Sequence, residues 1–391
     1  MKLLYLICCV SLAVLARAEE KALENVFHDA SSKFASKMLY EVAKINTEKS
    51  FAISPFSVLT PLALLSIAAR DTTRDELWEA IGTNDDNSTK EIFTLVNDRV
   101  KSLKGVTVKM ASKIYLALNY DVYTDFGVGR WDSFGSELQN IDFDQNVKAA
   151  QEVNTWVEKQ TNNHIKDIVS ADDVDLYTRA LLVDVFYFKG QWKDQFEKSL
   201  TSEKDFHVNN KDTKKVSMMY RRGNYKFTES SLLKSQVIEI PYKDREASLV
   251  VVLPRDIEGI KDVQEILKDP TVLQNTRKQM YEAGVELYLP KFQIETTTDL
   301  KDVLQKMNVT KIFSDHLCRL DYLIRVRGNM YIAKALQKAS FEVDEGTSAA
   351  VDHLDLLSIV GGRPYVFIAN RPFIFYVLEG NNIILNGEYY A

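Results

Sequence analysis

The chain has 391 residues, of which 46% are hydrophobic and 27% charged, and a formal net charge of -6. Glycine and proline are scarce, at 15 and 8 residues, which excludes a collagen-like, low-complexity or disordered chain. The negative charge disfavours nucleic acid as a partner, and basic stretches such as Lys101–Lys109 and Lys211–Lys215 lack the interleaved aromatic residues that nucleic-acid binding uses. The composition predicts an ordered, mildly acidic globular protein.

The first eighteen residues have the pattern of a secretory signal peptide. Lys2 supplies the positive start, Leu3 to Leu15 are mainly apolar, and residues 16–18 (Ala-Arg-Ala) resemble a cleavage site. This apolar run is too short to span the ~30 Å of a bilayer's hydrocarbon core, and no other run approaches ~20 residues. We therefore expect residues 1–18 to be a leader, residues 19–391 to form one mature domain, and the protein to be secreted into the extracellular space without a membrane partner.

Cysteine and asparagine usage agrees with export. Cys8 and Cys9 lie in the expected leader, so the mature chain keeps Cys318 alone and has no internal disulfide. We interpret Cys318 as a buried small apolar residue, with a free thiol as the alternative. Asn87 begins the triplet Asn-Ser-Thr and Asn308 begins Asn-Val-Thr, which predicts two glycosylation sites.

The first part of the chain predicts helices. Phe34, Met38, Leu39 and Val42 recur at three- to four-residue spacing, which places them on one face of a helix that begins near Ser31. Further helices are predicted over Ser57–Ala69, Asp71–Ile81, Lys90–Leu103 and Lys148–Val169.

Strand patterns dominate from Ala180 onward. Ala180–Phe188 is a continuous apolar run rich in branched and aromatic residues, which is typical of a buried strand. Further strands are predicted over Val237–Ile240, Ser248–Leu253, Val285–Leu289, Met330–Val343, Pro372–Leu378 and Asn382–Asn386. Because no linker separates the helices from the strands, the chain is predicted to be a single α+β domain, with N-terminal helices packed on large mixed β-sheets.

One long segment, residues 345–364, has neither pattern and lies between two predicted strands. Structureless loops of more than ~12–15 residues are uncommon inside a compact domain and are usually functional. Small residues dominate its first part, and Leu356, Leu357, Ile359 and Val360 its last. We therefore expect this loop to be exposed and to present apolar side chains to a partner.

Motifs of catalysis are missing from the sequence. It contains no Gly-x-Ser-x-Gly, His-Glu-x-x-His, Cys-x-x-Cys or Walker pattern, and its five histidines are widely scattered. We expect no enzymatic activity, no metal site and no cofactor.

Five motifs in order along the chain resemble those of the serpin superfamily of protease inhibitors. They are Ile53–Ser57 (Ile-Ser-Pro-Phe-Ser), Phe186–Trp192 (Phe-Tyr-Phe-Lys-Gly-Gln-Trp), Val216–Met219, Leu289–Phe292 (Leu-Pro-Lys-Phe) and Asn370–Phe373 (Asn-Arg-Pro-Phe). The resemblance covers essentially the whole of residues 19–391, and several ordered motifs are far more specific than any one of them.

The resemblance implies a mechanism in which the loop serves as a substrate for the target protease. A protease attacks it and forms an acyl-enzyme, and the cleaved loop inserts into the central sheet as a new strand, a transition for which serpins are the standard example. The partner is therefore a target protease held covalently by a serpin expected to be monomeric. The implied hinge is Glu345, Gly346, Thr347, Ser348, Ala349 and Ala350, and the implied polar zone under the sheet is Ser54, Ser57, Asp184 and Gln337.

Counting from the two ends of the loop places the scissile bond within Leu357, Ser358, Ile359, Val360 and Gly361. No lysine or arginine lies in this window, so a trypsin-like target is disfavoured. An elastase-like serine protease and a papain-like (cathepsin L-like) cysteine protease both remain open.

The hinge is one residue shorter than is usual in the family, and Asp352 and His353 follow it. The alternative function is therefore a non-inhibitory serpin with a carrier, storage or chaperone role.

Overall fold

The computed structural model describes residues 2–122, 134–325, 330–346 and 363–391; for residues 1–20 and Ala22 no side chain is described. The N-terminal part is helical, as the sequence pattern predicts. The helices are α1 (Lys2–Ile45), α2 (Pro55–Ala68), α3 (Asp71–Ile81) and α4 (Asp86–Lys101). All of α2 is buried, and its N-terminus is capped by Ser54, whose side chain accepts a hydrogen bond from the Ser57 N–H.

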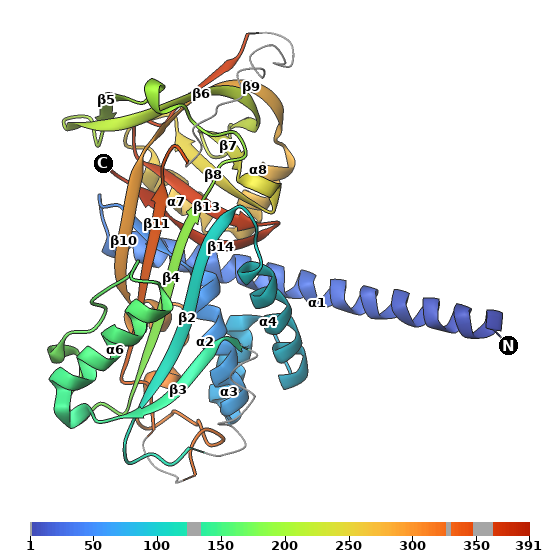
Figure 1. Ribbon diagram of the computed structural model, residues 1–391, viewed down its shortest axis with the longest axis vertical. Coiled ribbons are helices and arrows are strands. Elements are labelled where there is room, and N and C mark those ends of the chain that lie inside the picture. Colours follow the sequence, from blue (N-terminus) through green and yellow to red (C-terminus); the bar gives the residue numbers. More distant parts are fainter. Residues whose placement is uncertain (1, 123–133, 326–329, 347–362) are drawn as a thin grey trace.

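A five-stranded mixed sheet forms the middle of the molecule (Figure 1). Its strands, in spatial order, are β10 (Phe292–Asp299), β11 (Lys334–Val343), β4 (Ala180–Gly190), β2 (Val106–Ala117) and β3 (Ser136–Ile141). The β10–β11 and β4–β2 pairs are antiparallel, whereas β11–β4 and β2–β3 are parallel.

The second sheet contains the remaining strands. In spatial order they are β1 (Phe51–Ile53), β14 (Asn382–Tyr389), β13 (Phe373–Glu379), β8 (Ala247–Pro254), β7 (Ser235–Pro241), β6 (Thr213–Ser230), β9 (Tyr281–Pro290) and β12 (Tyr365–Ile368), with β5 (Ser202–His207) paired to β6. The further α-helices of the described residues are α6 (Asn146–Gln160), α7 (Ile260–Leu267), α8 (Pro270–Lys278) and α9 (Leu300–Lys306).

Two hydrophobic clusters cover the two faces of the five-stranded sheet. The larger joins α1–α4 to both sheets and includes Phe186 and Phe341. The smaller lies beneath α6 (Asn146–Gln160), where Val153 and Val157 pack with strand residues such as Val183. Because successive strand residues point to opposite faces, β4 contributes to both clusters, which explains why Ala180–Phe188 is apolar except for Asp184.

The predicted fold class is confirmed, but some boundaries are wrong. Helix α6 ends at Gln160 rather than at Val169, because Asn162 and Asn163 take left-handed conformations with φ of 52° and 63°. β11 begins at Lys334 rather than at Met330. The strands β2 and β6 were not predicted, because charged side chains interrupt their apolar patterns.

Helix α1 begins at Lys2 rather than near Ser31, and its N-terminal part projects from the body of the molecule (Figure 1). Residues 2–18 of the predicted leader lie within this projecting part. Among the described residues, no helix combines the length and the apolar character needed to cross a membrane. Cys318 is partly buried, and burial raises the pKa of its thiol to about 12.

Candidate functional site

The predicted loop begins where β11 ends, beside a parallel strand pair that we call the seam. In the seam, β11 lies directly against β4, in a register that runs from Lys334 opposite Leu181 to Glu342 opposite Lys189. After Val343 the chain continues through Asp344, Glu345 and Gly346. A strand that entered between β4 and β11 would therefore have to separate two strands that are now in contact.

A buried polar cluster spans the middle of the seam, and it contains the four residues expected beneath the sheet. The Nε2 of Gln337 donates to the Asp184 Oδ2 at 2.6 Å, to the Ser57 Oγ at 2.9 Å and to the Ser54 carbonyl at 2.9 Å. The Ser57 hydroxyl also donates to the Asp184 Oδ2, at 2.6 Å. The cluster therefore joins β4 and β11 to the start of α2.

Asp184 is the one carboxyl group of this cluster, and its side chain is fully buried. Burial raises its pKa to about 7, although the hydrogen bonds from Gln337 and Ser57 act in the opposite direction. Its Oδ1 atom is buried and has no hydrogen-bond partner among the described residues. The carboxyl is therefore readily protonated near neutral pH while the seam is closed.

The end of the seam is held by a network of ion pairs. Lys189 on β4 lies 2.8 Å from Glu342 and 2.8 Å from Asp344, and the Tyr187 hydroxyl donates to Glu342 at 3.0 Å. Burial raises the pKa of Asp344, but the hydrogen bonds from Lys189 and from the Gly346 N–H outweigh it, so the net pKa is lowered. The network stabilises the ionised forms of Lys189 and Asp344, and it fixes the point at which the loop leaves β11.

Glu345 and Gly346, the first two predicted hinge residues, are held in place as well. Glu345 is 5% exposed, and its carboxylate lies 2.9 Å from the Lys291 Nζ and accepts from the Thr201 hydroxyl at 3.1 Å. Gly346 has a φ of 99°, which strongly favours glycine, and an added Cβ would lie 3.0 Å from Gln195. A residue with a side chain at position 346 would therefore be strained.

A segment that we call the strap, residues 161–179 between α6 and β4, crosses the face of the seam. The Lys338 Nζ of β11 donates to the Lys166 carbonyl at 2.6 Å, and Lys334 of β11 pairs with Asp173. His164 stacks on Tyr187 of β4, with ring centroids 3.9 Å apart. The strap thus contacts both strands of the seam.

The other predicted site residues are not all described. Thr347–Ala350 and the window Leu357–Gly361 lie outside the described residues. Asn87, in the first turn of α4, and Asn308, just after α9, are exposed. Within the described part of the chain, no group of three or more His, Cys, Asp or Glu side chains could hold a metal ion.

Several residues of the site were not predicted from the sequence. Lys189, Lys334 and Lys338 pair with residues distant along the chain, and a lysine within a strand gives no local sign of its partner. Lys291 lies in a quoted motif, but its pairing with Glu345 becomes visible only in the folded chain.

Comparison with known proteins agrees with this geometry. The family model for serpins (serine protease inhibitors) matches residues 29–390. Antichymotrypsin-2 of Bombyx mori is 44% identical over 94% of this chain and 99% of its own, and antitrypsin of the same species is 43% identical over 97% of each chain. The crystal structure of Serpin48, a highly specific serpin of the insect Tenebrio molitor, superposes with a TM-score of 0.84 at 29% identity, covering 93% of this chain and 98% of that one.

The chain belongs to the serpin family. The names of its relatives antichymotrypsin-2 and antitrypsin describe protease inhibitors.

Proposed function

We propose that this serpin is exported and inhibits a protease as a suicide substrate. The nucleophile of the protease attacks a carbonyl carbon of the loop, the peptide bond breaks, and the N-terminal part of the loop remains attached to the enzyme as an ester or thioester. The attached part then inserts between β4 and β11 and carries the protease with it.

One observation carries the proposal: the loop leaves β11 at a closed seam whose middle holds a buried polar cluster. Gln337 donates a hydrogen bond to Asp184 across the two strands that insertion would part. A purely structural sheet gains more from apolar packing here, because a buried carboxyl costs free energy unless it is fully hydrogen-bonded. A polar interior suits strands that must separate and pair again.

The proposed target has an apolar primary specificity pocket, in an elastase-like serine protease or a papain-like cysteine protease. No basic residue lies in the window Leu357–Gly361, and Arg363 is too late in the chain to precede the cut. The name of the antichymotrypsin-2 relative favours an apolar pocket, whereas that of the antitrypsin relative points to a basic residue. The window of this chain, which contains no basic residue, supports the apolar class.

A protease panel tests the function. The pure protein is incubated with elastase, chymotrypsin, cathepsin L and trypsin, and complexes that survive denaturing electrophoresis are counted. We expect complexes with one or more of the first three. Cleavage without any trapped complex would instead support the non-inhibitory alternative, which the short hinge and the residues Asp352 and His353 favour.

Export is tested separately. The full chain is expressed in insect cells, and the N-terminus of the protein in the medium is sequenced. We expect it to begin at Glu19. Retention of the protein in the cells with residues 1–18 still attached would contradict the proposed leader.

A further inference from the structure

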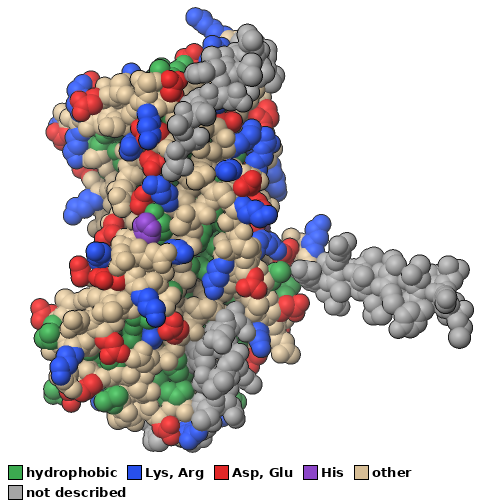
Figure 2. Space-filling view, viewed as in Figure 1, with side chains coloured by type: hydrophobic (Ala, Val, Ile, Leu, Met, Phe, Trp, Pro, Cys, Tyr) green, Lys and Arg blue, Asp and Glu red, His purple; other side chains and the backbone are tan. Residues whose placement is uncertain are grey.

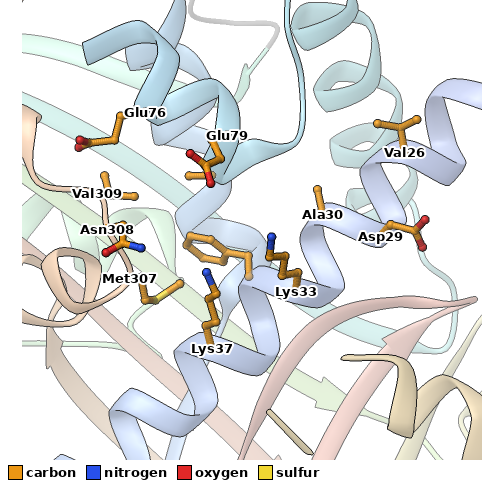
Figure 3. Close-up of a pocket in the computed structure, with 12 residues that line it drawn as sticks. Val26, Asp29, Ala30, Lys33, Lys37, Glu76, Glu79, Met307, Asn308 and Val309 are labelled. Atoms are coloured by element: carbon orange, nitrogen blue, oxygen red, sulfur yellow. The ribbon is translucent and has the colours of Figure 1, made fainter. Parts of the chain in front are cut away.

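A cavity of about 380 Å³ opens between α1, α3 and the turn that follows α9 (Figure 3). Its lining includes Phe34, Met307 and Val309, which are 4%, 7% and 1% exposed, and none of the residues of the seam. Cavities of this size hold small ligands. The molecule therefore has a second hollow, with an apolar floor, that the proposed inhibition does not use.

Polar groups without partners surround this floor. Lys33 and Lys37 are exposed, lie one turn apart on α1 and extend toward the cavity (Figure 3). Neither forms an ion pair within the described part of the chain, and Glu79 of α3 likewise has no partner there. Glu76 is engaged, since it accepts from the Lys311 N–H at 2.8 Å. Two donors and an acceptor around an apolar floor match a sugar ring, which has hydroxyl groups on its rim and C–H groups on its faces.

The source of such a sugar lies on the rim itself. Asn308 lines the cavity, is exposed, and has a φ of 72°. Its side-chain amide makes no hydrogen bond to any described residue, and it begins the triplet Asn-Val-Thr. Since the cavity wall includes the acceptor asparagine, a sugar attached there needs no linker to reach the floor.

We propose that Asn308 carries an N-linked glycan whose first sugar occupies this cavity, where Lys33 and Lys37 donate hydrogen bonds to it. The proposal rests on the proposed export, which supplies the co-reactant, a lipid diphosphate-linked oligosaccharide. The Asn308 Nδ2 forms a bond to the anomeric carbon of the first N-acetylglucosamine. The bond from that carbon to the diphosphate breaks, and the amide proton passes to a base.

Covalent attachment makes a weak sugar contact effective. A tether this short holds the sugar at an effective concentration in the millimolar range or above, so contacts too weak to capture a free sugar are populated. Asn87 provides the contrast, because it is exposed in the first turn of α4 and does not line this cavity. A glycan at Asn87 should therefore extend into solvent.

The test uses the full chain secreted from insect cells. Peptide mass spectrometry locates the glycans, and thermal unfolding is compared for the wild type, Asn308→Gln, Asn87→Gln and the double variant Lys33→Ser/Lys37→Ser. We expect the loss of the Asn308 glycan to lower the unfolding temperature by ~2 °C or more, a change that a modest contact produces in a chain of this size. The Asn87 variant should differ from the wild type by less than ~0.5 °C.

The lysine variant separates the loss of contacts with the sugar from a general effect of the two substitutions on stability. It should lower the unfolding temperature when Asn308 is glycosylated and leave it unchanged in the Asn308→Gln background. Hydrogen exchange over residues 29–37 should slow only in the glycosylated protein. A bare Asn308, or a lysine effect of equal size with and without the glycan, would overturn the proposal, whereas a failure of inhibition in the protease panel would leave it standing.

Discussion

Gln337 on β11 and Asp184 on β4 are register partners, and the Gln337 amide donates to the Asp184 carboxyl at 2.6 Å. The hydrogen bond joins residues 153 positions apart in sequence and lies across the seam. Burial raises the pKa of Asp184 to about 7, against an ordinary value near ~4 in the unfolded chain. The native protein therefore retains a proton that the unfolded chain releases between these two values.

The first prediction follows from this proton. Because the native protein binds this proton more tightly than the unfolded chain, the proton adds to the free energy of unfolding. This contribution is fully present below pH ~4 and is lost as the pH rises to ~7, and over this range the free energy of unfolding falls by up to ~1.4 kcal/mol per pH unit. Asp184→Asn should remove this dependence and stabilise the protein at pH 8 by on the order of 2 kcal/mol. Urea unfolding between pH 5 and pH 8 measures both effects.

Two controls accompany this variant. Asp205→Asn alters an exposed carboxylate, paired with Lys215, and should leave the slope between pH 5 and pH 8 unchanged. Glu388→Gln should reduce the slope further, because burial also raises the pKa of Glu388 to about 7. An Asp184→Asn protein with the wild-type slope would show that Asp184 is ionised in the closed seam.

The second prediction concerns the anchor of the hinge. Lys291→Ala leaves the Glu345 carboxylate, 5% exposed, without its cation, and should lower the free energy of unfolding by about 1–2 kcal/mol. Lys291→Arg keeps a cation and should recover most of the loss. Urea unfolding at pH 7 compares the three proteins, and equal stability of the alanine variant and the wild type would count against a role for this pair.

A third prediction addresses insertion. In an inserted strand, Thr347 and Ala349 share one face and Ser348 lies on the other. If Thr347 faces the core, Thr347→Arg places a charge where the strand must dock, so the protease should cleave the loop without being trapped. Ser348→Arg is the matched control and should retain more inhibition. The ratio of trapped to cleaved protein on a gel gives the result, and unchanged trapping by Thr347→Arg would refute insertion in this register.

The fourth prediction concerns target choice. Arginine in place of Ser358 or Val360 should create a reaction with trypsin-like proteases, because their primary pocket binds a basic side chain. Mass spectrometry of the released C-terminal peptide identifies the cut bond. A cut outside Leu357–Gly362 would show that the predicted window is misplaced.

Local patterns predicted the strands and helices whose faces are uniformly apolar. β4 was predicted within two residues of its end because it is buried on both faces. β2 was not predicted, because Lys109 and Lys113 interrupt its apolar pattern. In the structure Lys113 is nevertheless buried, with its ammonium group against the rings of Tyr115 and Trp156. A lysine with an apolar stem and a paired ammonium gives a polar signal at a buried position.

The candidate site was less predictable from local patterns. Asp184 lies in an apolar run that gives no sign of a carboxyl's partners, and only the family resemblance grouped it with Ser54, Ser57 and Gln337. The structure brings these four together, whereas the ion pairs of Lys189 and the contacts of the strap had no signal. Such contacts depend on the register between strands far apart in sequence, which the side-chain pattern of a single strand does not specify.

The direction of the strands at the seam has a further consequence. β4 and β11 run parallel, so a segment that leaves the end of β11 and folds back between them runs opposite to both. Insertion thus exchanges one parallel ladder for two antiparallel ladders, the arrangement that is slightly more stable per residue. Withdrawal of the inserted strand would have to break both ladders before the original one could form again. In the proposed mechanism, insertion is therefore effectively irreversible, and each molecule can trap a protease only once.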